Sequence, residues 1–315
     1  MRKFILFIMI STLLTSCISD GDKVKKKVTE GHVEVTGGKI WYKIVGADKK
    51  GAPLLVVHGG PGAPHDSLEP LEALAEDRPV IFYDQLGCGN SDHPTDTLLW
   101  KVERFVEEIK LLREKLKLDK FHLLGQSWGA MLATEYLLRE NPEGLLSLTL
   151  SGPLLSSPRW IEDQNRLVTL LPETIQNTIK QSEQSGDYSS QEYQDAVQEY
   201  YKIHLCRMDP LPEPLNRTNS KMALNIYLYM WGPSEFTATG TLKSADLTGE
   251  LHKIKVPVLL TCGEFDEATP ESVRYFQSRI PGSKLHIMQG CSHSHHLENP
   301  DEYTEVTGRF IKSNE

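Results

Sequence analysis

The stretch "FHLLGQSWGAMLATEYLL", residues 121–138, decides the fold, because it holds one serine between two glycines. Its centre, Gly125-Gln126-Ser127-Trp128-Gly129, follows a short apolar run and precedes a helical pattern. A G-x-S-x-G motif between a strand and a helix predicts a sharp turn that exposes the serine above a sheet. The two glycines permit such a turn because they carry no Cβ. The sequence therefore predicts that Ser127 is a nucleophile.

Short apolar runs alternate with helical patterns on both sides of this turn. The run "ERFVEEIKLLREKLKL" has the apolar spacing of an amphipathic helix. The segment "HVEVTGGKIWYKIVG" predicts a β-hairpin with Gly37 and Gly38 at its turn. Buried strands are predicted for "APLLVVHGG", "RPVIFYDQLG", "LLSLTLSG", "VPVLLTCGEFD" and "KLHIMQG". Strands that alternate with helices predict an α/β fold with a mostly parallel sheet and flanking helices.

Residues 156–235 interrupt this alternation. They are polar, rich in Gln and Glu, and largely helical in pattern, as in "SSQEYQDAVQEYYKIHL". We interpret them as a helical cap inserted into the fold, lying over the strand ends where open α/β sheets bind ligands. The predicted core then consists of residues 31–155 and 236–315.

The first residues have the pattern of an export signal. "MRKFILFIMISTLLTSC" combines a basic start, an apolar stretch and small residues before Cys17. Its end resembles the lipobox of bacterial lipoproteins. That resemblance implies a signal peptide over residues 1–16, a lipid on Cys17, and a membrane-anchored protein of the cell envelope, in the outer membrane if the host is Gram-negative. Residues 17–30 are then a polar tether. A plain signal or a short anchor helix is the alternative.

Composition limits the classes of function. The chain has 315 residues, of which 39% are hydrophobic and 24% charged, and its net charge is -9. These values are typical of a soluble globular domain, and the negative charge argues against a general nucleic-acid binder. The cysteines after Cys17 lack C-x-x-C spacing, so we interpret them as buried small residues, and no Cys and His set predicts a metal site: Cys88, Cys206, Cys262 and Cys291.

A serine nucleophile needs a base, and the base needs a third group that orients it. In a fold with this turn, the order along the chain is Ser, then Asp or Glu, then His. Asp266 follows one predicted strand and His293 follows the next, so both are expected at the same edge of the sheet as Ser127. His295 and His296 are rivals, which we interpret as loop or pocket-rim residues.

Acyl transfer also requires N–H donors for the developing oxyanion. The segment "VVHGGPG", residues 56–62, places a tight glycine loop after a predicted strand. In this fold the second donor is the N–H after the nucleophile. We therefore predict that Gly60 and Trp128 form the oxyanion hole, while His58 shapes the loop.

Several motifs together resemble the proline iminopeptidase branch of the α/β-hydrolases, which includes the tricorn-interacting aminopeptidase. They are "HGGPG", "YDQLGCGNSD", "GQSWGA", "GPSEFTATGTLKSADLT", "GEFDEATPE" and "CSHSHHLENP". The resemblance implies release of N-terminal residues, often proline, from short peptides through an acyl-enzyme and without a cofactor. It supports His293, which lies five residues before Glu298. It also implies that Glu235 and Glu267 bind the substrate amine.

Two other functions remain open at this point. An esterase or lactonase of the same fold would keep Ser127, Asp266 and His293 but would not need Glu235 and Glu267. A non-catalytic surface binding protein could keep the fold alone. The preferred first residue, the length of peptide accepted and the oligomeric state do not follow from the sequence.

Overall fold

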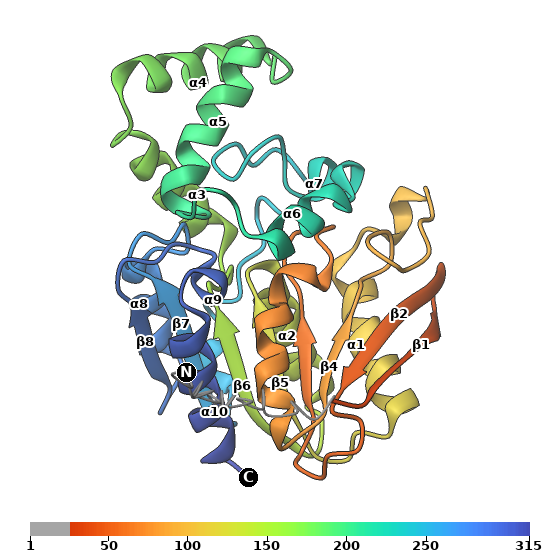
Figure 1. The fold of residues 1–315 in the computed structure, drawn as a ribbon. Coiled ribbons are helices and arrows are strands. Elements are labelled where there is room, and N and C mark those ends of the chain that lie inside the picture. Colours follow the sequence, from red (N-terminus) through yellow and green to blue (C-terminus); the bar gives the residue numbers. More distant parts are fainter. Residues whose placement is uncertain (1–25) are drawn as a thin grey trace, which may run out of the picture.

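The computed structural model describes residues 26–315, and its centre is an eight-stranded sheet (Figure 1). The strand order is β1-β2-β4-β3-β5-β6-β7-β8. Strand β2 pairs antiparallel with β1 and β4, and the remaining neighbours are parallel. The strands are β1 (Val28–Val35), β2 (Gly38–Val45), β3 (Leu54–Val57), β4 (Val80–Tyr83), β5 (Phe121–Gln126), β6 (Leu145–Ser151), β7 (Val258–Gly263) and β8 (Lys284–Met288). The prediction of an α/β fold with a mostly parallel sheet is confirmed.

Helices flank the sheet on both faces and continue over one of its edges (Figure 1). They are α1 (Val102–Leu116), α2 (Trp128–Glu140), α3 (Ser157–Val168), α4 (Glu173–Ser185), α5 (Gln191–His204), α6 (Glu213–Ser220), α7 (Leu224–Met230), α8 (Pro270–Arg279), α9 (His295–Glu298) and α10 (Pro300–Lys312). Three 3₁₀ segments are η1 (His65–Glu76), η2 (Thr97–Leu99) and η3 (Leu251–Lys253).

Alternation along the strands sends side chains into two separate cores. In β3, Leu55 and Val57 pack in a core with residues of α1, α2 and α8, whereas Leu54 and Val56 pack in a second core with residues of η1 and α10. This follows from the pleat of a strand, in which successive side chains point to opposite faces. A strand buried on both faces reads as an unbroken apolar run, which is why "LLVV" predicted β3 correctly.

The first strand begins earlier than predicted. Strand β1 starts at Val28 and pairs along its length with β2, so residues 28–30 of the predicted tether belong to the sheet. Lys26 is already docked, since its Nζ donates to the carbonyl oxygen of Glu72 at 2.7 Å. The polar composition of this segment is misleading because β1 is the edge strand and much of it is exposed to solvent. The rest of the predicted tether, to residue 25, lies outside the described residues.

The turn between β5 and α2 brings backbones closer together than any side chain would allow. A Cβ on Gly125 would lie 2.2 Å from the carbonyl oxygen of Gly129, and a Cβ on Gly129 would lie 2.2 Å from the carbonyl oxygen of Val57 in β3. Between the glycines, Ser127 has φ 55° and ψ −121°, a backbone conformation that residues other than glycine rarely adopt. The N–H of Ser127 donates to the carbonyl oxygen of Ser151 at 2.9 Å. Both glycines are therefore required by close packing.

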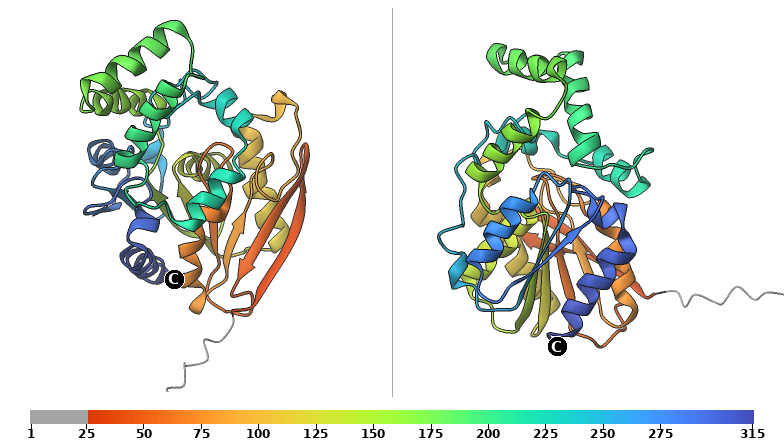
Figure 2. Two further views of the ribbon diagram at one scale, coloured as in Figure 1. Left: turned by 45° about the horizontal axis from the view of Figure 1, so that its top comes forward. Right: turned by 90° about the vertical axis from the view of Figure 1, so that its left-hand side faces the viewer.

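The segment between β6 and β7 carries α3 to α7, which we call the helical insertion. The helices lie over the upper edge of the sheet, and α4 and α5 project furthest from it (Figures 1 and 2). They have a small core of their own, made of Leu167, Leu171, Ile179, Tyr193, Ala196, Val197, Tyr200 and Phe236. The insertion thus stands over the ends of the parallel strands. Its treatment as a separate cap with the limits 156–235 stays a prediction.

The packing at the turn predicts that Gly129→Ala destabilises the protein. The added methyl group would overlap the Val57 carbonyl, which belongs to a central strand and has no room to move. Overpacking of this kind costs about 1–3 kcal/mol in the free energy of unfolding. Denaturant unfolding of the purified variant measures it. Gly249→Ala is the matched control, since a Cβ there meets nothing within 4 Å. Equal stability of the two variants would contradict the close approach.

Candidate active site

Two of the predicted site residues are in direct contact at the carboxyl ends of β7 and β8. Nδ1 of His293 lies 2.7 Å from Oδ1 of Asp266, and both side chains are buried. The carboxylate is held by backbone donors as well. The N–H of Ala268 donates to Oδ1 at 2.7 Å, and the N–H of Gly263 donates to Oδ2 at 3.1 Å. The pair is therefore fixed by the loop after β7.

Each member of the pair shifts the pKa of the other. Burial acts to raise the pKa of Asp266, but the charge and hydrogen bond of His293 outweigh it and hold that pKa well below its usual range. Burial acts to lower the pKa of His293, but the charge and hydrogen bond of Asp266 raise it above the usual value. The arrangement stabilises an imidazolium beside a carboxylate, which is what a proton-accepting histidine requires.

The other nitrogen of His293 faces two side chains. Its Nε2 lies 3.0 Å from Nε2 of Gln126 and 3.7 Å from Oε1 of Glu267. With the Nδ1 proton directed to Asp266, Nε2 is an acceptor, and the Gln126 amide donates to it. Sequence reasoning missed Gln126, although it precedes Ser127 within the motif itself. Its place next to the serine is the signal that could have revealed it.

Ser127, Gly60, His293, Glu235 and Glu267 all line one cavity of about 270 Å³, which we call the site cavity. The structure thus brings together, around one space, residues that lie up to 233 positions apart, from Gly60 to His293. Trp128, also predicted for the site, is the first residue of α2 and has a fully buried side chain. Only its backbone N–H, next to Ser127, is suited to the predicted role.

The glycine loop is held in shape by His58, as predicted. The N–H of Gln85 donates to Nε2 of His58 at 2.8 Å, and the amide of Gln85 donates to the His58 carbonyl oxygen at 2.9 Å. Oε1 of the same amide accepts from the indole N–H of Trp128 at 3.1 Å. Burial lowers the pKa of His58 to about 4, so the ring is neutral. Gln85, which sequence reasoning did not single out, links the glycine loop to the start of α2.

Two acidic side chains stand on the far side of His293 from Asp266. Glu267 is buried, and among the described residues its Oε2 has no hydrogen-bond partner. Glu235 is partly buried, and its Oε1 accepts from the hydroxyl of Tyr227 at 2.5 Å. Tyr227 lies on α7 within an apolar run, so nothing in its spacing indicated this contact.

The pKa values of both glutamates are raised. For Glu267, burial is the first cause and the charges of Glu235 and Asp266 are the next. For Glu235, burial raises the pKa and the Tyr227 hydrogen bond opposes it in part. An unpaired buried carboxylate is costly, and a cation between the two would relieve that cost. The pair is therefore suited to binding a positively charged group.

The structure places His295 and His296 in a helix rather than on a loop, in contrast to that part of our interpretation of the sequence. Both are buried and belong to the short helix α9. Nε2 of His295 hydrogen-bonds with Thr261 Oγ1 at 3.0 Å and Ser151 Oγ at 3.1 Å, which places it beneath Asp266. His296 lines the site cavity. Sequence spacing could not show this, because the turn of α9 sends consecutive side chains in different directions.

The loop that carries His293 is tied to the helical insertion. The N–H of His293 donates to the carbonyl oxygen of His204 at 2.9 Å, at the end of α5. Glu298 accepts from the N–H of Arg207 at 2.5 Å and from the hydroxyl of Ser292 at 2.7 Å. The histidine loop therefore depends on a turn of the insertion as well as on its own strand.

One group of side chains in residues 26–315 is close enough together to hold a cation: His65, Asp66 and Glu69. The side chains of Lys221 and Arg217 already pair with its two acids. Asp66 Oδ1 lies 2.8 Å from Nζ of Lys221 and 3.1 Å from Nε of Arg217, and Arg217 also pairs with Glu69. The cluster is an ion-pair network that joins α6 to η1. The four cysteines of the described chain are buried, as predicted, and the structure shows them free, which the sequence had left open: Cys88, Cys206, Cys262 and Cys291.

Comparisons with known proteins agree with this architecture. Residues 52–300 match the family model described as "alpha/beta hydrolase fold". A proline iminopeptidase of Heyndrickxia coagulans is 46% identical over 286 residues, which cover 90% of this chain and 99% of that relative. A proline iminopeptidase of Clostridium botulinum is 39% identical over 92% of this chain and all of that relative. The crystal structure of the Mycobacterium smegmatis proline iminopeptidase is 34% identical, with a TM-score of 0.83 over 91% of this chain and 98% of that one.

The comparison contradicts the predicted location. The curated relatives are matched over 99% and 100% of their own length and carry the name proline iminopeptidase. The prediction of a lipid-anchored protein of the cell envelope or outer membrane is therefore wrong. It rested on a short pattern of basic, apolar and small residues before Cys17, each of which is common in any sequence. Cys17 itself lies outside the described residues.

No helix within residues 26–315 has both the length and the apolar character that crossing a bilayer demands.

The identity of more than a third extends over nearly the whole of each relative, and the fold agrees with that of the Mycobacterium smegmatis proline iminopeptidase. The serine turn, the buried Asp–His pair and the helical insertion over the strand ends all belong to this same matched region. The chain is an enzyme of the alpha/beta hydrolase fold and belongs to the proline iminopeptidases.

Proposed function

We propose that the protein releases N-terminal residues, proline by preference, from short peptides through an acyl-enzyme on Ser127. The observation that carries this proposal is the pair of acidic side chains, Glu235 and Glu267, on the wall of the site cavity beside His293. A general esterase has no use for two carboxylates at that position. An enzyme that must recognise a free α-ammonium does, because a desolvated cation needs a compensating charge.

The amine of the substrate binds between Glu235 and Glu267. Glu267 supplies Oε2, which lacks a partner among the described residues, and Tyr227 orients Glu235 through its 2.5 Å hydrogen bond. A bound ammonium favours the ionised form of both acids, which are otherwise held partly protonated by burial and mutual repulsion. Fixing the amine there sets the first peptide bond above Ser127. The site cavity of about 270 Å³ suits one compact first residue.

Ser127 then attacks the carbonyl carbon of the first residue. His293 Nε2 accepts the hydroxyl proton, and Asp266 stabilises the imidazolium through Nδ1. The Gln126 amide has to give way at Nε2 when the serine hydroxyl takes its place. The N–H groups of Gly60 and Trp128 stabilise the oxyanion. The imidazolium protonates the leaving amine, and water activated by His293 releases the acyl group.

The proposed nucleophile predicts the effect of Ser127→Ala. The variant should lose at least about a thousandfold in kcat on proline p-nitroanilide, with a residual rate from the oxyanion hole and binding. Steady-state kinetics and labelling by a serine-directed phosphonate both measure this. Ser220→Ala, at an exposed serine of α6, is the control and should match wild type. Retention of more than roughly a tenth of the wild-type turnover by Ser127→Ala would rule out the assignment.

The amine clamp predicts selective losses in Glu235→Gln and Glu267→Gln. Breaking one partner of a buried ion pair costs roughly 3–5 kcal/mol, so kcat/KM on proline p-nitroanilide should fall on the order of a hundredfold to several thousandfold. Hydrolysis of p-nitrophenyl acetate, which has no amine, should be nearly unchanged.

Glu264→Gln, in the same loop but outside the site cavity, is the matched control. N-acetylation of the substrate should reproduce the loss in the wild-type enzyme. If the two glutamine variants discriminate between free and acetylated prolyl substrates as wild type does, the protein is a general esterase of this fold.

The raised pKa values predict two different pH profiles. His293 must be neutral to accept a proton and the two glutamates must be ionised to bind the amine, so activity falls as pH decreases through these pKa values. For proline p-nitroanilide all three groups contribute to the acid limb of kcat/KM, whereas p-nitrophenyl acetate reports His293 alone. The acid limb for the anilide should therefore be steeper and reach further toward neutral pH. Superimposable profiles would contradict the role of the glutamates.

A further inference from the structure

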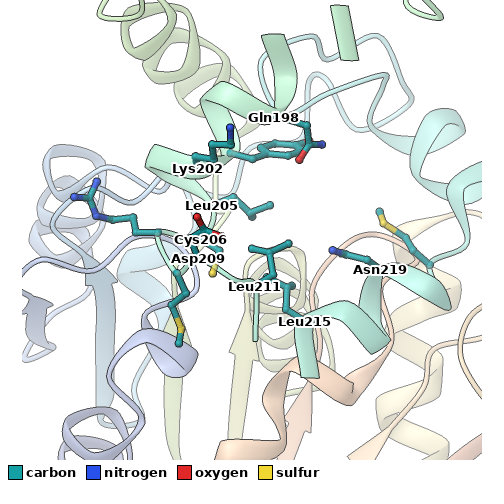
Figure 3. Close-up of a pocket in the computed structure, with 12 residues that line it drawn as sticks. Gln198, Lys202, Leu205, Cys206, Asp209, Leu211, Leu215 and Asn219 are labelled. Carbon is teal, nitrogen blue, oxygen red and sulfur yellow. The ribbon is translucent and has the colours of Figure 1, made fainter. Parts of the chain in front are cut away.

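A second and larger cavity opens beside the site cavity. Its volume is about 740 Å³, against about 270 Å³ for the site cavity. Figure 3 shows Gln198 and Lys202 of α5 on one side of it, and on the other Leu211, which precedes α6, with Leu215 and Asn219 of α6. We call it the outer cavity. Nothing in the proposed mechanism so far uses it.

The two cavities share a wall. Six residues line both of them: Gln198, Tyr201, Leu205, Leu215, Asn219 and Met222. A third cavity, beside α8, shares no lining residue with the site cavity. A chain leaving the site cavity across this shared wall therefore enters the space between α5 and α6.

The outer cavity is lined mainly by apolar side chains. Leu205, Cys206, Met208, Leu211, Leu215 and Met222 contribute to it, with Tyr201 at the shared wall. Leu211 and Met208 are 38% and 39% exposed, so this wall presents apolar surface to solvent. An apolar ligand that covered them would gain the free energy of removing that surface from water.

Two of the three charged side chains of the wall, Lys202 and Arg207, are engaged elsewhere, and Asp209 is the third. Nζ of Lys202 lies 2.5 Å from Oε1 of Glu199. The guanidinium of Arg207 stacks over the ring of Phe265 at 4.0 Å, and its backbone N–H donates to Glu298. Apart from Asp209 and the amides of Gln198 and Asn219, this wall offers a ligand its leucine and methionine side chains.

The amine clamp sets the direction of the substrate. Glu235 and Glu267 fix the amino end within the site cavity, so only one residue precedes the scissile bond and the rest of the peptide must lie beyond Ser127. We propose that the outer cavity binds this leaving portion of the peptide and favours apolar side chains in its first residues. The inference rests on the proposed function of the site cavity and adds a preference on the far side of the scissile bond.

The experiment compares kcat/KM for three substrates: prolinamide, Pro-Gly-Gly and Pro-Leu-Leu. Prolinamide has no chain beyond the scissile bond and reports the site cavity alone. Burying leucine side chains in an apolar cavity should make Pro-Leu-Leu at least about tenfold better than Pro-Gly-Gly. A ratio near one in the wild-type enzyme would overturn the inference.

Leu211→Glu tests the cavity itself, because Leu211 lines the outer cavity and not the site cavity. The variant should lower kcat/KM for Pro-Leu-Leu at least about tenfold and leave prolinamide unchanged, while Leu211→Met should keep the wild-type preference. The matched control is Leu228→Glu, at a leucine of α7 that is 46% exposed and lines neither cavity. It should behave as wild type on all three substrates.

The outcomes separate this inference from the proposed function. If wild type hydrolyses prolinamide and Leu211→Glu keeps the preference for Pro-Leu-Leu, or loses activity equally on all three substrates, the outer cavity does not bind the leaving peptide and the proposed function stands. If wild type hydrolyses none of the three, the proposed function fails and the inference fails with it.

Discussion

The close approach of α2 to β3 is the constraint on which the geometry of the site depends. Because Gly129 lies against the carbonyl of Val57, the first turn of α2 starts almost in contact with the sheet, and Ser127 is forced into a left-handed conformation above it. The strained residue costs free energy that the surrounding packing must supply. Ser127 therefore lines the site cavity together with Gly60 of the glycine loop after β3 and His293 of the loop after β8. The other parts of the site are arranged around a serine whose backbone is fixed by the packing of the turn.

The pKa values of the two consecutive acids after β7 shift in opposite directions. Asp266 receives two backbone N–H groups and the imidazole, so its charge is stabilised and its pKa falls. Glu267, one residue later, is equally buried, but it keeps an oxygen without a partner and faces a second acid, so its pKa rises. The difference comes from the direction of the side chains. Asp266 points toward Nδ1 of His293, whereas Glu267 points into the site cavity. The first is suited to orienting a base, the second to receiving a cation.

Features encoded by local patterns could be predicted from the sequence. The buried strands, the serine turn and the positions of Asp266 and His293 at neighbouring strand ends all follow from short apolar runs and the residues that end them. Glu235 and Glu267 were found only through resemblance to a family, since an acid on a loop is usually a solvated one. Gln126 was missed because its contact with His293 joins distant elements, and Tyr227 was missed because it lies within an apolar run. The early start of β1 was missed because an exposed edge strand has a polar composition.

The hydrogen bonds between the histidine loop and the end of α5 have a consequence for protein engineering. A chimera that exchanged the helical insertion for that of a relative would also exchange the carbonyl of His204 and the N–H of Arg207, which support His293 and Glu298. New specificity and catalytic competence would then change together. Transplants that begin after Arg207, or that stop before the last turn of α5, would keep the native support of the histidine loop while varying the rest of the insertion.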